Sequence, residues 1–591
     1  MGAAAAVGTA GIAAGVAWWR SRDAGLAEPP REPPPADFPN ALLVPGPSGM
    51  FGVVDATQPL AIVAKATSHP LVPGKPGPML AYEIEQDGVR FLNPVLKTRK
   101  GAGFRARFWN ALDEESIIHW HGLEVDSNND GHPHYAIPGG ATYDYHFTVT
   151  NRAATYWYHA HPHHLTGKQV HLGLAGLLIV EDDEELALQQ ALDLTFGVND
   201  IPLVIQDKRF DDSGALIYTP DAQDRDHGYL GTDALVNLTP RPYFDAAPRI
   251  YRFRILNASN ARLLRLAFRH GEGLIDFHLI GSDGGLLDRP RPLQEAFVPA
   301  GGRLDVLLDL RAARSPADLT LVSLPFDPMY NESESSAPAG DHAPHATDGS
   351  DAPRRSAIPD GAALDLLRIR VRGKAAYQRA VPQTLSFLAP PPATDAAPRV
   401  ITFDLAGGVW RINGMTYDIK ATPIVVKRGA IEVWEVRNTA RGMPHPVHLH
   451  GFQSRVLSRE GSPPQQQSLA VDPGGLAATD LGWKDTVTVW PGEIVRIVTD
   501  FSHPYLGDQV YMVHCHNLEH ADHGMMLNFR IASLTALRKE PPRDVLSREV
   551  AAVRWHHRRG IGGREGQYRP RRADHHLMMR RPRRLFPTVW I

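Results

Sequence analysis

The sequence predicts an all-β protein built from β-sandwich domains, and three observations carry this prediction. Short apolar or alternating runs recur through the middle of the chain, as the buried and half-buried strands of a sandwich do. Helical patterns are few and short. Glycine (52 residues) and proline (50 residues) are abundant, which favours many strands joined by turns. The clearest strand candidates are residues 177–180, 250–256, 304–310 and 431–436.

The chain begins with a signal-like segment, residues 1–38. Gly2 to Trp19 is an uncharged run rich in alanine and glycine, and Arg20 and Arg22 follow it. Because its residues are small and weakly apolar, the run suits a secretory signal better than a membrane anchor. We therefore expect an exported protein, periplasmic or extracellular, with no stable membrane span. A basic segment is absent before the run, so we expect the true start to lie upstream and to carry a twin-arginine stretch. A disordered alanine-rich terminus is the alternative.

Shifts in composition divide the rest of the 591-residue chain, which is too long for one compact core. An acidic cluster from Glu181 to Glu185 closes a first domain, and a proline-rich stretch around Pro391 precedes the last one. Between them, residues 331–356 are polar, as in a mobile loop. We expect a first domain at 39–185, a second at 195–375, a linker at 376–398, a third at 399–535 and a tail at 536–591.

The tail is dense in arginine and histidine and lacks a periodic apolar pattern, so we expect it to be disordered. A patch for nucleic acid or a membrane surface is a less favoured alternative, and an abnormal reading frame would give the same composition. The net charge of the whole chain is -3. Nucleic-acid-binding proteins need a basic surface, so we expect no nucleic-acid partner. The sequence indicates no oligomeric state.

Four short clusters of histidine hold the chemistry of the sequence. In a β-strand, residues i and i+2 point to the same face, so each His-x-His places two imidazoles in one space. Two clusters lie early in the chain and two late, which suits one cavity between the first and third domains. The clusters are His119-Trp120-His121, His159-Ala160-His161, His445-Pro446-Val447-His448-Leu449-His450, and His514-Cys515-His516 followed by His520 and Met525.

These residue types point to copper. A single cysteine excludes an intramolecular disulfide and leaves either a buried thiol or a chemically active one. A thiolate with two imidazoles and a distant thioether is the ligand set of an electron-transfer copper, and Cys515, His445, His520 and Met525 supply it. An isolated His-x-His is usually a chance or surface feature, whereas an isolated methionine or cysteine is usually a core residue. We interpret as chance or surface features the other histidines of these regions, with a position near the site as the alternative for some of them; they are His132, His134, His163, His164 and His171.

The four clusters resemble those of the multicopper oxidases, which include laccases, bilirubin oxidases and bacterial cuprous oxidases. The resemblance covers roughly residues 40–533 and implies three cupredoxin-like Greek-key β-sandwich domains. Further segments look like those of the bacterial cuprous oxidases. They are residues 166–170 with 176–177, 206–208, 257–262, 282–285 and 482–486.

The resemblance also implies about four copper ions, of the kinds called type 1, type 2 and type 3. By position, the type 1 ion takes His445, Cys515, His520 and, axially, Met525. The type 2 ion takes His119 and His448. One type 3 ion takes His121, His159 and His516, and the other takes His161, His450 and His514.

The resemblance implies a reaction as well. A reduced substrate gives single electrons near His445 or His520, and the electrons cross Cys515 to the histidines beside it. Four electrons then reduce dioxygen to two waters. Asp130 matches an acidic residue near the type 2 copper of the family, and we expect it to relay protons. Its alternative role is that of a turn residue before Gly131.

One position departs from the family on the proton side. Ala521 stands where a glutamate commonly follows the second type 1 histidine. We therefore expect dioxygen reduction to be slower or more sensitive to pH than in close relatives, although Glu519 or Asp522 would be able to substitute through water.

A second departure concerns the substrate. Arg441 stands where cuprous oxidases carry an aspartate, and it would repel a cation. Residues 331–356 contain no methionine, whereas thioethers are what would capture Cu(I). We regard His342 and His345 in that segment as solvated. We therefore expect a laccase-like oxidase of phenols or similar organic donors.

Two other functions stay open. One is an oxidase of Cu(I) or Mn(II) that serves copper tolerance. The other, less favoured, is a non-enzymatic relative that keeps the fold as a scaffold. Such relatives lose copper ligands, whereas every ligand position is filled here.

Overall fold

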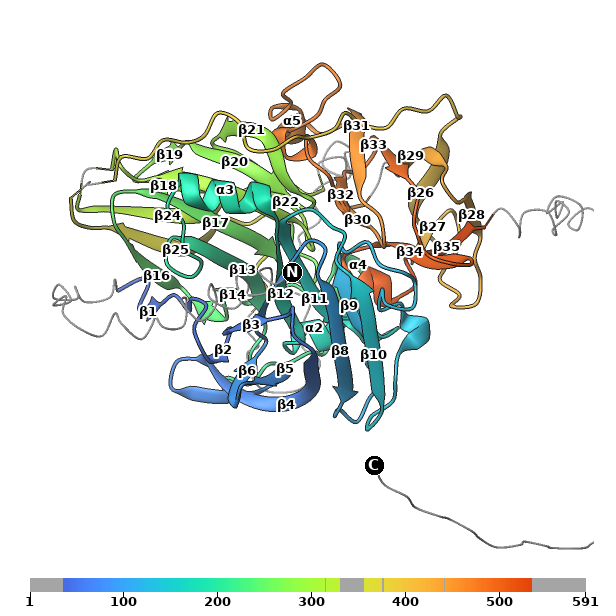
Figure 1. Ribbon diagram of the computed structural model, residues 1–591, viewed down its shortest axis with the longest axis horizontal. Helices are drawn as coiled ribbons and strands as arrows, with labels where there is room; N and C mark the ends of the chain where they lie inside the picture. The colour runs from blue at the N-terminus through green and yellow to red at the C-terminus, as the bar shows by residue number, and fades with distance from the viewer. Residues whose placement is uncertain (1–35, 314, 330–355, 375–376, 440–441, 534–591) are drawn as a thin grey trace, which may run out of the picture. The chain divides into compact units, whose positions relative to one another are not determined.

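The computed structural model describes residues 36–313, 315–329, 356–374, 377–439 and 442–533. Strands make up 48% of the structure and helices 8%, which confirms the predicted all-β fold. The described strands form six sheets that follow one another in pairs along the chain (Figure 1). Each pair encloses one apolar core that takes side chains from both of its sheets. This arrangement is a sandwich repeated along the chain.

The first pair of sheets carries the two early histidine clusters. Buried and exposed residues alternate along β8 (Gly103–Asn110), as expected for a strand with one face on the core. The six-stranded sheet has the order β10 (Thr142–Thr148), β8, β4 (Leu60–Val72), β5 (Lys75–Gln86), β6 (Val89–Leu92) and β2 (Gly49–Met50). The five-stranded sheet has the order β3 (Val53–Asp55), β7 (Val95–Arg99), β12 (Ala175–Glu181), β11 (Ala154–Ala160) and β9 (Ile118–His121).

The second pair contains none of the predicted copper ligands. One sheet has the order β1 (Asn40–Ala41), β16 (Pro242–Ala246), β25 (Leu364–Val371), β24 (Ala317–Ser323), β18 (Leu264–His270) and β19 (Gly273–Ile275), with β22 (Glu295–Val298) also beside β18. The other has the order β15 (Thr239–Pro240), β14 (Asp233–Val236), β13 (Asp200–Lys208), β17 (Ile250–Asn257), β23 (Arg303–Asp309), β20 (Phe277–Ser282) and β21 (Gly285–Leu293). Strand β1 therefore joins this pair, although it lies in the segment predicted as the first domain.

Strand β17 differs from the prediction. Its alternating arginines indicated a half-buried strand, but every residue of β17 is buried. The Arg254 guanidinium donates to the Asp200 carboxylate at 2.7 Å and to Glu185 at 2.6 Å. Arg252 pairs with Glu185 and with Asp305. Because every charge has an opposite partner, burial of the two arginines is tolerated.

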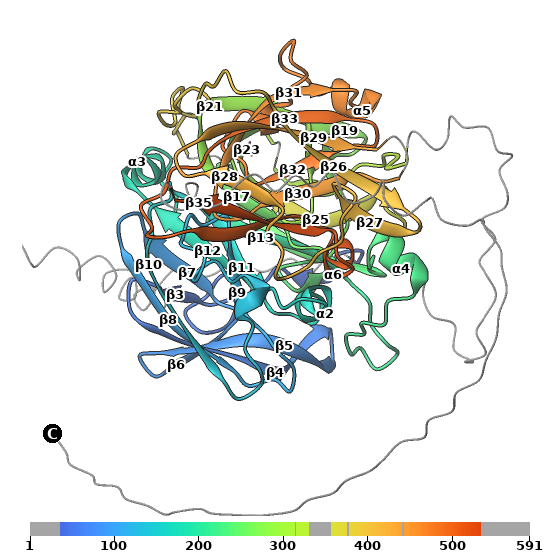
Figure 2. The ribbon, with the colours of Figure 1, turned by 90° about the vertical axis from the view of Figure 1, so that its right-hand side faces the viewer.

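The third pair carries the two late histidine clusters. One sheet has the order β27 (Val409–Ile412), β26 (Arg399–Ala406), β29 (Ile431–Asn438), β33 (Ile494–Asp500) and β31 (Ser454–Glu460). The other has the order β28 (Ile424–Lys427), β35 (Met526–Ala532), β34 (Gln509–Cys515), β30 (His445–Leu449) and β32 (Thr486–Val489). Figure 2 shows these strands above those of the first pair.

Short helices connect the strands. They are α2 (Thr166–His171), α3 (Asp183–Ala191), α4 (Ala222–His227), α5 (Pro464–Gln467) and α6 (Leu518–Asp522), with 3-10 turns η1 (Pro133–Tyr135) and η2 (Ala478–Asp480). Among the described residues, none of these helices has the length and apolarity needed to cross a membrane. The predicted domain limits stay predictions. Most of the signal-like segment, nearly all of the loop at 331–356 and the tail at 536–591 lie outside the described residues.

Candidate functional site

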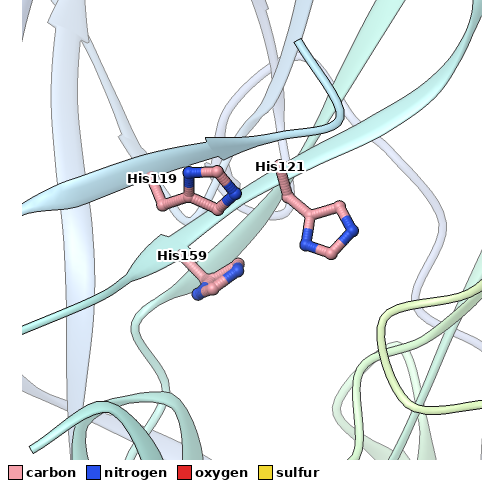
Figure 3. A group of neighbouring side chains, drawn as sticks. All are labelled: His119, His121 and His159. Atoms are coloured by element: carbon pink, nitrogen blue, oxygen red, sulfur yellow. The ribbon is translucent and has the colours of Figure 1, made fainter. Parts of the chain in front are cut away.

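The eight histidines predicted for the type 2 and type 3 ions lie on four strands or directly after them. His119 on β9 lies opposite His159 on the antiparallel strand β11, and His121 shares the face of His119. Figure 3 shows these three rings on one side of the two strands. In the third pair, His448 on β30 lies opposite His514 on β34. The other members directly follow strands β11, β30 and β34, and are His161, His450 and His516. None of the eight residues is more than 1% exposed.

The predicted type 2 pair is brought together by two strands from different sandwiches. The Nε2 atoms of His119 and His448 lie 3.3 Å apart. His119 Nδ1 is 2.6 Å from the Asp130 backbone oxygen, and His448 Nδ1 is 2.8 Å from that of Asp485. A carbonyl only accepts, so both Nδ1 atoms carry the proton and both Nε2 atoms present a lone pair. Two lone pairs that face each other fit a shared cation.

One predicted type 3 set shows the same arrangement. The Nε2 atom of His514 lies 3.1 Å from that of His450 and 3.4 Å from that of His161. His514 Nδ1 bonds to the Cys515 backbone oxygen, and His450 Nδ1 bonds to the Asp130 carboxylate. The donor atoms of these three histidines lie within 4.8 Å of one another. The set therefore converges on one point, as the prediction requires.

The other predicted type 3 set is looser. The ring centroids of His121, His159 and His516 lie 5.0 to 5.7 Å apart. The structure groups His121 and His159 more closely with His119 than with His516. His159 Nε2 and both ring nitrogens of His516 are buried and have no hydrogen-bond partner in the part of the chain that the structure describes. Such buried and unpartnered nitrogens are what a metal ligand presents before the metal binds.

The eight histidines are held in the neutral form that binds metal. Burial is the largest cause, and it lowers the pKa of His159 to about 3 and that of His514 to about 4. The same burial, with charge from neighbouring histidines, holds the pKa of His119 well below its usual value. Neutral imidazole is a common ligand of copper, so the donor set fits the ion that the sequence predicts.

The predicted type 1 ligands form a separate buried group in the third core. Cys515 Sγ lies 3.4 Å from His445 Nδ1 and 3.6 Å from His520 Nδ1. Met525 is fully buried in the same core, and its backbone oxygen accepts from the Cys515 N–H at 3.1 Å. Burial raises the pKa of the Cys515 thiol. A thiolate here therefore needs a cation beside it, which a copper ion would be.

The predicted type 1 ligands are covered by two residues that sequence analysis did not identify, Asp226 and Trp410. His520 Nε2 lies 2.9 Å from the Asp226 backbone oxygen, at the end of α4. The Trp410 indole N–H donates to the same oxygen at 3.0 Å, and its ring lies 4.7 Å from that of His520 and 4.8 Å from that of His445. Asp226 is exposed, whereas His445, Cys515 and His520 are 0% exposed. Trp410 and Asp226 thus form the layer between the type 1 histidines and solvent at this point.

Asp130 contacts two predicted copper ligands, His450 of a type 3 set and His119 of the type 2 pair. Its carboxylate is 2.7 Å from His450 Nδ1, and its backbone oxygen meets His119 as described above. Burial, followed by the charge of Asp126, raises its pKa well above the usual value. Gly131 has a positive φ of 82° and lies against the Ile118 backbone oxygen, so the predicted turn is present as well. The geometry gives Asp130 a positioning contact, and the proton relay stays a prediction.

The remaining histidines correct part of the sequence analysis. We interpreted five of them as chance or surface features, which is wrong for His132 and His171, because both are buried. His132 Nε2 bonds at 2.8 Å to Asn528 on β35, and so joins the first sandwich to the third. His171 packs against Tyr229 with ring centroids 4.8 Å apart. His134 and His164 are exposed, and His163 is half-buried. The residues that contact His132 and His171 are distant in sequence, so no local pattern predicted that these two histidines would be buried.

Ala521 lies in an apolar setting. Its side chain is 1% exposed and packs with Met512, Met526 and Tyr417. The two acids considered as substitutes are engaged in other hydrogen bonds. Glu519 accepts hydrogen bonds from Tyr218, Asn260 and the Tyr229 N–H, and Asp522 accepts from the Thr166 and Gly167 N–H groups. Burial raises the pKa of Glu519, and it raises that of Asp522 to about 8. Slower dioxygen reduction stays a prediction.

Several residues of the substrate argument lie outside the described part of the chain. They are Arg441, His342 and His345.

Comparison with known proteins identifies the family. Two profiles, both described as multicopper oxidase, match residues 87–185 and 390–534. The multicopper oxidase mco of Staphylococcus aureus is 30% identical over 443 residues, which cover 74% of this chain and 82% of that protein. A laccase of Bacillus subtilis is 30% identical over 450 residues, which cover 70% of this chain and 79% of that protein.

Solved structures agree. The crystal structure of the McoA multicopper oxidase from the hyperthermophile Aquifex aeolicus is 41% identical and covers 83% of this chain and 99% of that one, with a TM-score of 0.72. The cupredoxin-like sandwich fold predicted from the sequence is thus confirmed. Its relatives are named multicopper oxidases and laccases, and the chain itself belongs to the multicopper oxidase family and is an oxidoreductase.

Proposed function

We propose that this oxidoreductase takes single electrons from small organic donors of the phenol type and uses them to reduce dioxygen to water. The observation that carries the proposal is the position of Cys515. Its sulfur meets His445 and His520, and its two neighbours in sequence, His514 and His516, belong to the eight-histidine group. One residue therefore joins an electron-transfer group to a second metal-binding group.

The residues present fit about four copper ions, distributed as the family resemblance implies. His445, Cys515, His520 and Met525 would hold a type 1 ion, and His119 with His448 a type 2 ion. The type 3 pair would be held by His121, His159 and His516 and by His161, His450 and His514. Copper would supply the one-electron chemistry that connects single-electron donors with a four-electron acceptor.

The chain's own residues set the conditions for that chemistry. Burial of the histidines excludes bulk water from the place where oxygen would be reduced. The backbone oxygens of Asp130 and Asp485 fix the tautomers of His119 and His448, so that their Nε2 atoms face each other. Reduction of one dioxygen to two waters consumes four electrons and four protons, and we propose that Asp130 relays protons toward this region.

Access to the type 1 group supports an organic donor. The apolar side chain of Leu405 is 46% exposed and lies opposite Trp410 across the β26–β27 hairpin. The layer over the histidines therefore includes an indole and an apolar neighbour, which suit contact with an aromatic ring.

One observation favours the second candidate, an oxidase of Cu(I). A cavity of about 1850 Å³ is bordered by Asp224 and His227 of α4 and by Gly228, which follows the helix, and Met329 and Met443 also line it. Thioethers bind Cu(I) well. Steady-state kcat/KM values for a simple phenol and for Cu(I), measured under the same conditions, separate the two proposals. A phenol preference supports the first, and a preference for Cu(I) with negligible phenol oxidation supports the second.

Replacing Trp410 with Ala should raise kcat/KM for a bulky phenol by about 10-fold, the scale on which a pocket distinguishes substrates by size. The indole ring separates His445 and His520 from solvent, so its loss lets a bulky phenol come closer to these two histidines. Trp410→Phe keeps a ring and should change the value much less. The measurement compares a bulky and a small phenol in the two variants with copper content held equal. An equal fall in kcat/KM for both phenols would show that Trp410 conducts electrons or supports the fold rather than restricting access to the type 1 histidines.

We also propose that the protein is exported to the periplasm or beyond the cell by the twin-arginine route. The uncharged run at residues 2–19 supports this proposal. Fractionation of cells that produce the full-length natural gene product tests it, since recovery only from the cytoplasm would contradict export.

A further inference from the structure

Asp485 lies where the three sandwiches meet. It precedes β32 in the third pair, and its Oδ1 is 3.1 Å from His121 Nε2 in the first pair. From the second pair, Arg303 donates to Oδ1 at 2.7 Å and also to Oδ2. Gln453 donates to Oδ2 at 3.0 Å. Asp485 is 2% exposed and Arg303 is 1% exposed. One carboxylate therefore contacts groups from all three sandwiches.

This contact fixes the tautomer of His121. The Asp485 carboxylate accepts hydrogen bonds from Arg303 and Gln453, so we assign the contact with His121 as one that the imidazole donates, with its proton on Nε2. Its Nδ1 then carries the lone pair, and among the described residues that atom has no hydrogen-bond partner. His119, His448 and His514 show the opposite pattern, because their Nδ1 atoms contact backbone oxygens. His121 therefore differs from these three histidines, because Nδ1 rather than Nε2 is the ring nitrogen left to bind a metal.

The surroundings of the pair are built for a close approach. Gly122, which follows His121, has a positive φ of 90°. A Cβ at that position would lie 2.5 Å from Asp485 Oδ2 and 3.0 Å from an Arg303 nitrogen. Only glycine therefore lets the β9 chain pass the ion pair at this distance.

A second ion pair holds the first in place. Lys484 Nζ lies 2.8 Å from Asp283 Oδ2, and Asp283 Oδ1 accepts from the Arg303 backbone N–H at 2.8 Å. Two cations and two carboxylates thus balance one another in a buried site. Asp283 and Asp485 belong to the segments 282–285 and 482–486, which resemble the family without supplying a predicted ligand. The arrangement gives both segments a physical role.

We propose that Asp485, held by Arg303, is a positioning residue that keeps His121 with Nδ1 toward the copper site and makes copper retention depend on the docking of all three sandwiches. The proposal rests on the proposed copper centre. Partners that orient a metal-bound histidine typically contribute 10- to 100-fold to metal affinity.

The test uses the full chain loaded with copper and the variant Asp485→Asn. The amide keeps the size of the side chain but removes the charge that holds Arg303 and His121. We expect copper to be lost to a competing chelator at about 10- to 100-fold lower chelator concentration than from the wild type. The rise in Tm that copper produces should shrink in the variant. Copper per chain and Tm are read without any activity measurement.

The matched control is Asp480→Asn. Asp480 is 3% exposed, and both of its oxygens accept from Arg459, at 2.8 and 2.9 Å, but its hydrogen bonds include no histidine. We expect this variant to lower the Tm of the copper-free protein while its copper retention stays close to that of the wild type. Equal copper loss in both variants, or wild-type retention in Asp485→Asn, would overturn the positioning role.

A second measurement needs no variant to fold. In a crystal structure of the copper-loaded wild type, His121 Nδ1 should face the metal and Nε2 should stay within hydrogen-bond distance of Asp485. A structure with His121 Nε2 toward copper would refute the proposal. If the wild type takes up no copper at all, the proposed function itself is wrong. That result differs from one in which the wild type binds copper but Asp485 does not position His121.

Discussion

Replacing Cys515 with Ser should abolish oxidase turnover, with a loss of at least about 1000-fold, as when one member of a catalytic unit is removed. The Cys515 sulfur lies within reach of both His445 and His520 and supplies the thiolate of the predicted type 1 set. A serine oxygen is a hard ligand and stays protonated, so the thiolate bond and its visible absorption band are lost together. The eight-histidine group contains no atom of the Cys515 side chain, and its copper should remain.

Three measurements check this expectation on one preparation. They are turnover with a phenol, the visible absorption spectrum and copper per chain. Circular dichroism should show an intact β fold, because the exchange buries one hydroxyl at a cost of about 1–3 kcal/mol. Cys515→Ala serves as the control for that hydroxyl and should behave in the same way. A Ser variant that keeps more than a tenth of the turnover would show that electrons reach the histidine group by another path.

Replacing Asp130 with Ala should slow dioxygen reduction by about 100-fold while leaving electron uptake from the donor unchanged. The Asp130 carboxylate contacts His450 Nδ1, and none of the hydrogen bonds among the described residues joins it to His445, Cys515 or His520. Its loss removes both the contact that orients His450 and a candidate proton carrier. The oxygen side of the reaction is therefore affected, and the donor side is not.

The two half-reactions are measured separately. The blue band bleaches when donor is added without air, and it returns when air is admitted. Asp130→Ala should bleach at the wild-type rate and recover slowly. Asn129→Ala is the control, since Asn129 lies in the same turn, carries no charge, and bonds through its side chain to Asp126 and the His146 backbone N–H rather than to a predicted copper ligand. Slow recovery in both variants would assign the effect to the turn instead of the carboxylate.

Much of the candidate site follows from local sequence. A strand repeats every second residue, so each His-x-His had to place two rings on one face, and the structure brings the eight histidines into one buried group. The type 1 set followed from the chemistry of thiolate and imidazole, and Cys515, His445 and His520 lie together. The all-β fold followed from the same periodicity.

The rest depends on contacts that no local pattern encodes. His132 looked like a loop histidine, but Asn528 contacts it from 396 residues away. Arg303 and Asp485 are 182 residues apart and meet only when the sandwiches dock. The arginines of β17 alternated as in a half-buried strand, but they are fully buried and pair with acids from three other segments. No sequence motif marked Trp410 as part of the site. Its position beside the type 1 ligands depends on the Asp226 backbone oxygen, which both Trp410 and His520 contact.

The central claim is that Cys515 joins two groups of copper ligands in one enzyme. Copper analysis combined with an absorption spectrum of the purified, copper-loaded protein tests it most directly. The proposed function predicts about four copper ions per chain and an intense blue thiolate band. A colourless protein that holds no copper after loading would contradict the claim.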